Sequence, residues 1–391
     1  MRVIPLAAIP LDQLTARLLD WIQTARRDLP WRRDRRPYAV WIAEVMLQQT
    51  QAATVAAYYE RWMRRFPDLA TLAAAPLDDV LKAWEGLGYY ARARHLHRAA
   101  RQVMARHGGE LPAERQALLA LPGIGPYTAG AILSLAFGQR AAVLDGNVRR
   151  VLCRIYDVAT DPTEAATEAQ LWQIAETLVA AVAESAAGPL NEALMELGSL
   201  ICTPRRPACS TCPVTHLCLA HARGVETERP VARPRARPPH HTAVAGIIQD
   251  DGGACLLIRR PARGLLGGLW GFPGGVLNEG EVLEAGICRT IREQIGIEVL
   301  PEAAVGRIEH AYTHFRITLH VFRCQIVAGQ PQPLQCAAVR WTTPDEWRDL
   351  AFPVTDSRII RTLTDATAPL ARGRATPADC VATASRFAPP C

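Results

Sequence analysis

Residues 121–126 read Leu-Pro-Gly-Ile-Gly-Pro and separate two apolar stretches with helical spacing. Gly123 and Gly125 allow a sharp turn and leave backbone N–H groups uncovered. The helix expected next, over 127–137, directs its partial positive end outward. The stretch therefore predicts a helix–hairpin–helix whose turn can hold a phosphate without reading sequence. The alternative interpretation is an ordinary hairpin between two helices.

A second motif, Val-Leu-Asp-Gly-Asn-Val at 143–148, follows the hairpin. Asp145 stands where a helix over 147–155 is expected to begin, and aspartate is a favoured N-cap residue. The helix dipole keeps such a carboxylate ionised, which suits it to stabilise a nearby cation. We therefore predict that Asp145 both caps the helix and takes part in chemistry.

Four cysteines form a compact C-x6-C-x2-C-x5-C pattern, comprising Cys202, Cys209, Cys212 and Cys218. Four thiolates from one short loop can bind tetrahedral zinc or a [4Fe–4S] cluster. Zinc sites usually present two close pairs, so the irregular spacing favours the cluster and leaves zinc open. The chain has 11 cysteines, an odd number, of which four share one short loop and the others are scattered singly. This pattern indicates a cofactor in a reducing compartment rather than a disulfide framework. We expect a cytoplasmic protein of the bacterial cytosol or nucleoid.

The 391 residues suffice for two or three domains. Leu14, Leu18 and Ile22 show the helical spacing that recurs over residues 1–222, where prolines, Pro189 among them, are expected to end short helices. Residues 223–240 are rich in Arg and Pro and predict an extended linker. Residues 241–364 alternate short apolar runs with glycine and proline, predicting strands near 243–248, 254–258, 316–326 and 337–341, with helices near 281–294 and 355–363. The fold class is therefore multidomain, all-α and then α+β, and 365–391 is expected to be a disordered tail.

Composition excludes several classes of protein. With 49% hydrophobic and 21% charged residues the chain is not disordered throughout, and it has no apolar run long enough to span a membrane, so no membrane partner is expected. A net charge of +6 suits a polyanionic partner. Lys82 is the only lysine, and arginine cannot form an imine, so covalent imine chemistry has almost no available amine.

Glu44 lies in an otherwise apolar helical segment between Trp41 and Met46. Burial of a lone carboxylate there disfavours its charged form and raises its pKa, which equips it as a general acid. The alternative is an exposed helix carboxylate without a task.

These motifs resemble the MutY family of adenine DNA glycosylases, in the iron–sulfur branch of the helix–hairpin–helix glycosylases. The resemblance covers roughly residues 10–222 and rests also on Leu-Pro-Trp-Arg at 29–32, Trp-Ile-Ala-Glu-Val-Met-Leu-Gln-Gln-Thr at 41–50 and Gly-Leu-Gly-Tyr-Tyr-Ala-Arg-Ala-Arg at 86–94. It implies a [4Fe–4S] cluster in the 202–218 loop. It also implies a monomer that acts on double-stranded DNA with adenine opposite 8-oxoguanine or guanine.

The resemblance implies a role for each residue of the expected active site. Glu44 would protonate the flipped adenine, Asp145 would stabilise or trap the sugar cation, and Tyr127 and Asn147 would orient Asp145. Tyr127 occupies the position of the Schiff-base lysine in bifunctional relatives such as endonuclease III. Because a phenol cannot form an imine, the resemblance predicts a monofunctional enzyme that leaves an abasic site.

Extrusion of a nucleotide requires residues that fill the gap in the stack and hold the backbone. Gln49 and Tyr89 match the family's wedge residues, and Arg92 is expected at a phosphate. The full set of predicted DNA contacts is Arg32, Gln49, Thr50, Tyr89, Arg92, Gly123 and Gly125.

A degenerate Nudix box runs from Gly275 through Glu281 to Ile297. The box normally holds Mg²⁺ with carboxylates, yet Thr290 and Gln294 replace two of them. We expect a Nudix-like fold at 241–364 that has lost hydrolysis and is kept for 8-oxoguanine recognition. The family's Phe-Ser-His recognition loop corresponds to Tyr312, Thr313 and His314.

Three other functions remain as alternatives. The first is a bifunctional, endonuclease III-like pyrimidine glycosylase and lyase, which Tyr127 opposes. The second is a nucleotide diphosphate hydrolase with a DNA-binding appendage, which Thr290 and Gln294 oppose. The third is a non-catalytic DNA sensor, which the pair of Glu44 and Asp145 opposes.

Overall fold

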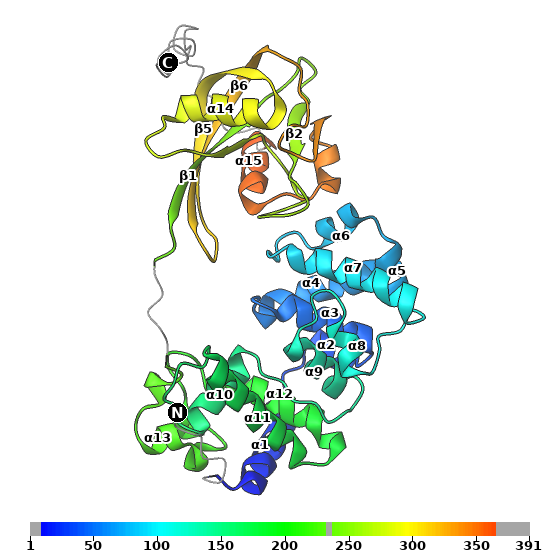
Figure 1. Cartoon of the computed structure of the whole chain (residues 1–391), viewed down its shortest axis with the longest axis vertical. Coiled ribbons are helices and arrows are strands. Elements are labelled where there is room, and N and C mark those ends of the chain that lie inside the picture. The colour runs from blue at the N-terminus through cyan, green and yellow to red at the C-terminus, as the bar shows by residue number, and fades with distance from the viewer. Residues whose placement is uncertain (1–8, 232–236, 365–391) are drawn as a thin grey trace, which may run out of the picture. The chain divides into compact units, whose positions relative to one another are not determined.

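The computed structural model describes residues 9–231 and 237–364. These residues form two compact units, one within Met1–Ala75 and His95–Arg235 and the other within Pro76–Arg94 and Ala236–Cys391 (Figure 1). The predicted tail, 365–391, lies outside the described residues.

The first unit is helical, as the sequence predicts. Its helices are α1 (Leu11–Ala25), α2 (Pro30–Arg33), α3 (Pro37–Leu47), α4 (Ala52–Arg65), α5 (Leu69–Ala74), most of α7 (Ala91–Arg106), α8 (Arg115–Leu119), α9 (Pro126–Leu135), α10 (Gly146–Ile155), α11 (Ala165–Ala180), α12 (Glu184–Leu200) and α13 (Leu219–Ala222). The helices expected after the hairpin and after Asp145 are α9 and α10. Across the described ranges of the chain, no helix is both long enough and apolar enough to cross a membrane.

Prolines mark helix starts more often than breaks. Pro30, Pro37 and Pro126 occupy first-turn positions of α2, α3 and α9, where a missing N–H costs nothing. The predicted break at Pro189 is wrong, because α12 continues through it. The helix is closely packed at this point, since a Cβ on the neighbouring Gly188 would lie 2.6 Å from the Ser134 carbonyl oxygen.

Helix α12 is the centre of the first unit, since it packs against α1, α9, α10 and α11. Its apolar face joins a continuous core that includes Leu18, Leu152 and Leu194. Helix α3, by contrast, is buried on every side and packs against α4 and α9. These two helices therefore approach α9 from different sides and enclose the space in which the active site lies.

The hairpin between α8 and α9 depends on Gly123. This residue has φ +80°, and a Cβ would lie 2.7 Å from Cβ of His95. Gly125 is different, because its backbone is extended and a Cβ would meet nothing within 4 Å. Gly123 is thus required by the turn itself, whereas Gly125 leaves open space at the start of α9.

The second unit is α+β. It contains α6 (Leu77–Ala83), β1 (His240–Ile247), β2 (Cys255–Arg259), β3 (Trp270–Gly271), β4 (Gly274–Val276), α14 (Leu283–Ile295), β5 (Glu298–Ala311), β6 (Arg316–Ala328), β7 (Ala338–Thr342) and α15 (Val354–Thr364). One sheet has the strand order β4-β1-β6-β5 and the other β3-β2-β7. Strands β1 and β6 are parallel, and the other pairs are antiparallel.

Strand alternation produces two cores in this unit. Along β1, Ala243 and Ala245 face a core that includes Ile359 of α15. Val244 faces the opposite core, which includes Ile291 of α14. Because both faces are covered, β1 reads as a continuous apolar run rather than as a polar–apolar alternation.

The described start of the predicted linker, 223–231, is folded rather than extended. Arg229 pairs with Asp157 at 2.7 Å, and its carbonyl oxygen accepts a 2.9 Å hydrogen bond from Nε of Arg154. The linker therefore begins only after a segment that is fixed to the first unit.

Gly123→Ala should destabilise the first unit by about 1–3 kcal/mol, because alanine is strained at positive φ and its Cβ meets His95. Gly125→Ala is the matched control and should leave stability unchanged. Urea unfolding of the two variants checks this, and equal stability would show that the hairpin does not need the glycine.

Candidate active site

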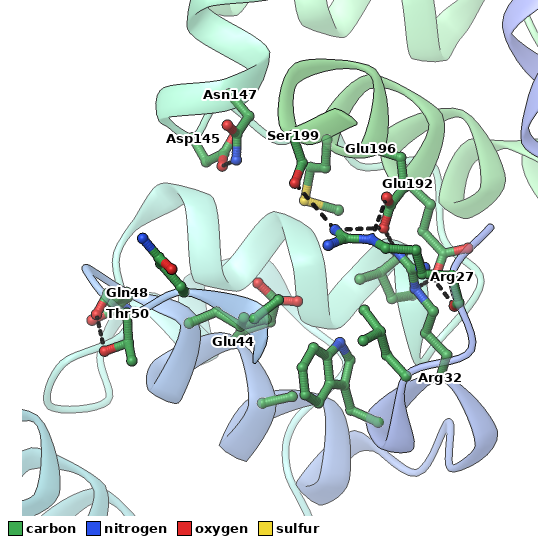
Figure 2. A pocket seen from close by; sticks show the side chains of 18 of the residues that line it. Arg27, Arg32, Glu44, Gln48, Thr50, Asp145, Asn147, Glu192, Glu196 and Ser199 are labelled. Carbon is green, nitrogen blue, oxygen red and sulfur yellow. Dashed lines mark hydrogen bonds and ion pairs between the residues drawn. The ribbon is translucent and has the colours of Figure 1, made fainter. Parts of the chain in front are cut away.

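One cavity of about 610 Å³ opens in the first unit, lined by residues of α2, α3, α9, α10 and α12 (Figure 2). Its walls include Glu44, Tyr127, Asp145 and Asn147, all four of the predicted catalytic residues. Arg32, Gln49 and Thr50, three of the predicted DNA contacts, also line it. The volume falls in the usual range for a small-molecule site.

Glu44 is buried, with 4% of its surface exposed. Loss of hydration raises its pKa to about 7, and the charges of Asp145 and Glu192 act in the same direction. The Tyr127 hydrogen bond and the Arg32 charge oppose the rise. The carboxyl can therefore hold a proton near neutral pH, as a general acid must.

Tyr127 on α9 donates its hydroxyl proton to Oε2 of Glu44 across 2.5 Å. Burial raises the pKa of Tyr127 well above its usual value, and the Glu44 charge adds to this, so the phenol remains protonated. The structure therefore pairs Tyr127 with Glu44. The orienting role that the resemblance gives Tyr127 concerns Asp145, and no direct hydrogen bond joins those two among the described contacts.

Asp145 is the N-cap of α10, as predicted from the sequence. Its Oδ1 accepts the Val148 N–H at 2.7 Å, and its Oδ2 accepts the Asn147 side-chain amide at 3.0 Å. Figure 2 shows Asp145 and Asn147 together on α10, apart from Glu44 on α3. The two carboxyl groups thus enter one cavity from different helices, and Asp145 has a fixed orientation.

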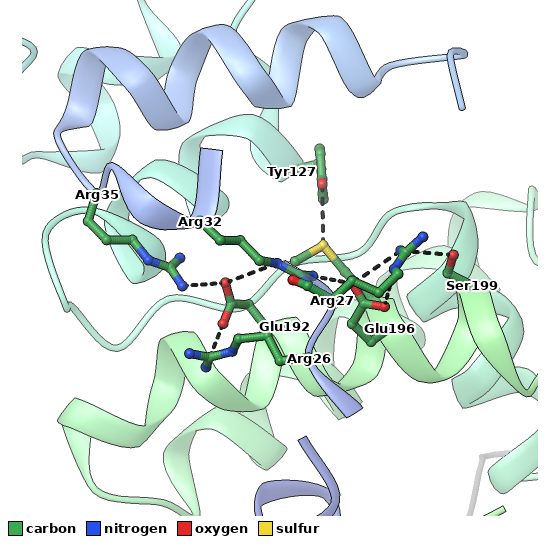
Figure 3. A network of polar contacts seen from close by, with 9 residues as sticks. Arg26, Arg27, Arg32, Arg35, Tyr127, Glu192, Glu196 and Ser199 are labelled. Atoms are coloured by element: carbon green, nitrogen blue, oxygen red, sulfur yellow. Dashed lines mark hydrogen bonds and ion pairs between the residues drawn. The ribbon is translucent and has the colours of Figure 1, made fainter. Parts of the chain in front are cut away.

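A network of buried ion pairs forms another wall of the cavity (Figure 3). None of its carboxylates was predicted from the sequence. Glu192 and Glu196 lie one turn apart on α12 and are both buried. Glu192 pairs with Arg26 at 2.8 Å and Arg35 at 2.7 Å. Burial of ions is unfavourable unless they are paired. The sequence does carry a signal for this network, because Glu192 and Glu196, like Glu44, are carboxylates in a largely apolar helix.

Two further arginines complete this network through Glu196. Arg27 binds it at 2.8 Å, and Arg32 makes a shorter contact with the same carboxylate. Arg32 was predicted to contact DNA, but its guanidinium is held inside the protein by Glu196 and by the Arg27 carbonyl oxygen, 2.8 Å away. The motif around Arg32 could not reveal this ion pair, because Glu196 lies far along the chain.

The four cysteines Cys202, Cys209, Cys212 and Cys218 line one small pocket and are all free of disulfides. Burial raises the pKa of Cys212 to about 12 and that of Cys218 to about 11. Such thiols ionise only when a cation compensates their charge, as iron does. The four cysteines share this pocket with His221 and Glu226. Four sulfurs around one pocket fit a [4Fe–4S] cluster, which would fix the loop rather than react with substrate.

Helix α10 joins this loop to the Asp145 carboxylate. Arg154 is 1% exposed and donates to Sγ of Cys202 at 3.2 Å and to the Thr203 carbonyl oxygen at 2.8 Å. Arg150 donates to the Cys202 carbonyl oxygen at 2.7 Å and to the Asn147 side-chain oxygen at 2.8 Å. Hydrogen bonds therefore run from the cysteine loop to the residue that binds Asp145. No motif in the sequence indicates either arginine.

The predicted wedge residues share an unusual backbone. Gln49 has φ +60° and Tyr89 has φ +48°, a conformation that costs non-glycine residues energy and is common at functional sites. Gln49 is exposed at the end of α3, and Tyr89 is 40% exposed. Both are available to a ligand.

Arg92, the predicted phosphate contact, is buried in the structure. Its guanidinium is buried, lies 5.1 Å from the centroid of the Trp84 ring, and donates to the Leu87 carbonyl oxygen at 2.9 Å. Burial lowers the pKa of Arg92 to about 10. Arg92 therefore fixes the loop that carries Tyr89, and the charge alone could not reveal this.

The predicted recognition loop, Tyr312, Thr313 and His314, forms the turn between β5 and β6 in the second unit. The Tyr312 ring stacks on Phe315 with centroids 4.7 Å apart. Thr313 and His314 are exposed, and the Thr313 hydroxyl contacts the hydroxyl of Tyr89, a residue of the same unit. The turn is thus rigid at its base and polar at its tip.

The altered positions of the Nudix box are part of the fold. The Gln294 amide exchanges two hydrogen bonds with the Gly274 backbone, at 2.9 and 2.7 Å. Thr290 is buried and donates to the Gly286 carbonyl oxygen at 2.8 Å. Glu281 and Glu293 both pair with Arg289, at 2.6 and 3.1 Å. These contacts leave a poor carboxylate set for Mg²⁺.

Comparison with known proteins agrees with this arrangement. Residues 42–177 match the HhH-GPD superfamily of base excision DNA repair proteins, 202–218 the iron-sulfur binding domain of endonuclease III, and 243–362 the NUDIX domain. The adenine DNA glycosylase of Rattus norvegicus is 36% identical over 88% of this chain and 76% of its own length. That of Homo sapiens is 37% identical over 88% of this chain and 72% of its own length. The structure of a thermostable thymine-DNA glycosylase, 32% identical, covers 55% of this chain and 97% of its own with a TM-score of 0.50.

The fold and the cavity define a helix–hairpin–helix DNA glycosylase of base excision repair, followed by a Nudix-like domain. It binds double-stranded DNA, and its four cysteines hold a [4Fe–4S] cluster. The chain belongs to the adenine DNA glycosylase family.

The raised pKa of Glu44 predicts a pH-dependent cost to stability. The folded carboxyl titrates near 7 and the unfolded one near 4.5, so the stabilisation present at low pH is lost as pH rises through 7. Glu44→Gln should therefore stabilise the first unit by about 2.5 kcal/mol more near pH 8 than near pH 5. Urea unfolding at both pH values measures this. Glu176→Gln, on the exposed side of α11, is the control, and an identical pH dependence in both variants would contradict the assignment.

Proposed function

We propose that this enzyme removes adenine paired with 8-oxoguanine or guanine and leaves an abasic site without cutting the strand. The observation that carries the proposal is the cavity that both carboxyl groups enter, protonatable Glu44 from α3 and Asp145 from the N-cap of α10. We further propose that it acts as a monomer in the cytosol or nucleoid, where a reducing environment keeps the cluster thiols out of disulfides.

Base removal begins with protonation of the flipped adenine. The base must leave the duplex to reach the cavity. Glu44 holds its proton near neutral pH because burial disfavours the carboxylate. Transfer of this proton to a ring nitrogen makes adenine a neutral leaving group. The phenol of Tyr127, 2.5 Å away, then stabilises the carboxylate that remains.

Departure of adenine leaves a positively charged sugar. Asp145 is suited to stabilise it because its side chain is fixed by Val148 and Asn147 before the reaction begins. Preorganised charge needs no rearrangement when the cation forms. Water then adds to the sugar carbon and releases a proton, which returns to the Glu44 carboxylate, and the abasic site is complete.

No lysine is among the described residues that line the cavity, which supports a monofunctional reaction. Tyr127 lines the cavity with a phenol, which cannot form a Schiff base. The only lysine, Lys82, belongs to α6 of the other unit and is bound to Glu85 at 2.7 Å and to the Leu350 carbonyl oxygen at 2.8 Å. We therefore propose that strand cleavage requires a separate step.

We propose that the Nudix-like domain recognises the 8-oxoguanine opposite adenine. The exposed hydroxyl of Thr313 and the imidazole of His314 supply hydrogen-bonding groups at the tip of a rigid turn. Hydrolysis is disfavoured, because Thr290 and Gln294 are engaged in the fold.

The reaction can be tested with duplexes that carry adenine opposite 8-oxoguanine, adenine opposite guanine, or thymine glycol. We expect cleavage at adenine only, and only after hot alkali. Asp145→Asn should slow excision by about 10²–10³-fold and Glu44→Gln by about 10²–10⁴-fold. Strand scission without alkali, or activity on thymine glycol, would favour a bifunctional pyrimidine glycosylase instead.

The recognition role predicts a selective loss. A Thr313→Ala, His314→Ala double variant should bind and cleave the 8-oxoguanine duplex about 10-fold less well, since lost hydrogen bonds of about 1.4 kcal/mol give that factor. The adenine–guanine duplex should change by less than about twofold. Thr362→Ala, an exposed threonine of α15, is the control. Equal losses on both duplexes would refute a role in reading 8-oxoguanine.

A further inference from the structure

The Tyr127 hydroxyl lies within hydrogen-bonding distance of two acceptors. One is Oε2 of Glu44 at 2.5 Å, and the other is the thioether sulfur of Met195 at 3.4 Å. Figure 3 shows the hydroxyl pointing to this sulfur. A phenol carries a single proton, so it can serve only one acceptor well at a time.

The acceptor that Tyr127 serves depends on whether Oε2 of Glu44 carries a proton. When Glu44 is ionised, its oxygen takes the phenol proton and the sulfur has no donor from Tyr127. When Glu44 carries a proton on Oε2, that proton is donated to the phenol oxygen. The proton of Tyr127 must then turn away, and Met195 is the acceptor that lies within reach.

Met195 is held in place for this contact. It lies on α12 between Glu192 and Glu196, both fixed by arginines, is partly buried, and lines the cavity. The charged and titratable groups that act on Glu44 come from several elements. They are Tyr127 on α9, Asp145 at the start of α10, Glu192 on α12 and Arg32 on α2. Met195 adds an uncharged contact that acts through Tyr127.

We propose that Met195 is a positioning residue for the general acid, because its sulfur accepts the Tyr127 proton when Glu44 is loaded with its own. The thioether thereby favours the proton-loaded acid over the carboxylate. This inference rests on the proposed function of Glu44 as the proton donor.

Met195→Leu separates this role from packing, because leucine fills a similar volume but accepts no hydrogen bond. The test is the pH dependence of single-turnover adenine excision. Proton-loaded Glu44 is required, so the rate falls as pH rises through its titration near 7. In Met195→Leu this midpoint should move down by about 0.5 pH unit, the equivalent of one weak hydrogen bond. The rate at low pH should be kept, and the rate above the midpoint should fall about threefold.

Two control variants separate this role of Met195 from a general effect on packing. Met104→Leu, an exposed position on α7, should leave the profile unchanged. In a Tyr127→Phe background, Met195→Leu should no longer move the midpoint. Cluster absorbance and thermal unfolding establish that each variant is folded. A uniform loss of rate at every pH, or a shift that persists without the phenol, would overturn the positioning role.

Failure of the proposed function gives a different result. If Glu44→Gln still excises adenine, Glu44 is not the general acid, and the inference about Met195 fails as well. An inactive Glu44→Gln variant together with an unmoved midpoint in Met195→Leu would refute only the role of Met195.

Discussion

The removal of the Glu44 carboxyl from water is the constraint around which the site is organised. Helix α3 is apolar on every side, so the fold buries whatever lies at position 44. A carboxylate there is unfavourable, and the pKa rises to about 7 for that reason. The burial of Glu44 therefore lowers stability at neutral pH while giving the carboxyl the raised pKa that a general acid needs. The surrounding contacts, from Tyr127 above all, make the buried acid tolerable and keep it usable.

The second carboxylate has the opposite environment. Asp145 is held at a helix N-terminus by Val148 and Asn147, and Asn147 is held in turn by Arg150. Arg150 also binds the backbone of Cys202. The geometry of the charged group thus depends on a loop about fifty residues away in sequence. This gives the [4Fe–4S] cluster a structural reason to be present in an enzyme whose reaction is not a redox reaction.

In the Nudix-like domain, the helix of the box serves the fold. Gln294 makes two hydrogen bonds to the Gly274 backbone, and the Thr290 hydroxyl bonds within its own helix. Both side chains are uncharged, so neither offers a metal the carboxylate that the box normally places there. The domain keeps the fold and the rigid β5–β6 turn, on which recognition would depend.

The sequence by itself determined what local rules control: the hairpin glycines, the Asp145 cap, the cysteine pattern, and the apolar segment that isolates Glu44. It did not reveal β5, because Pro301 and register shifts interrupt its alternation, or the continuity of α12 through Pro189. It placed Arg92 and Arg32 on DNA, although both side chains bind partners inside the protein. Only the tertiary structure decided these points, together with the Glu192–Glu196 network and the Met195 contact. Such partners are distant in sequence. The role of a charged group or a sulfur atom depends on its neighbours, and these are set by the tertiary structure.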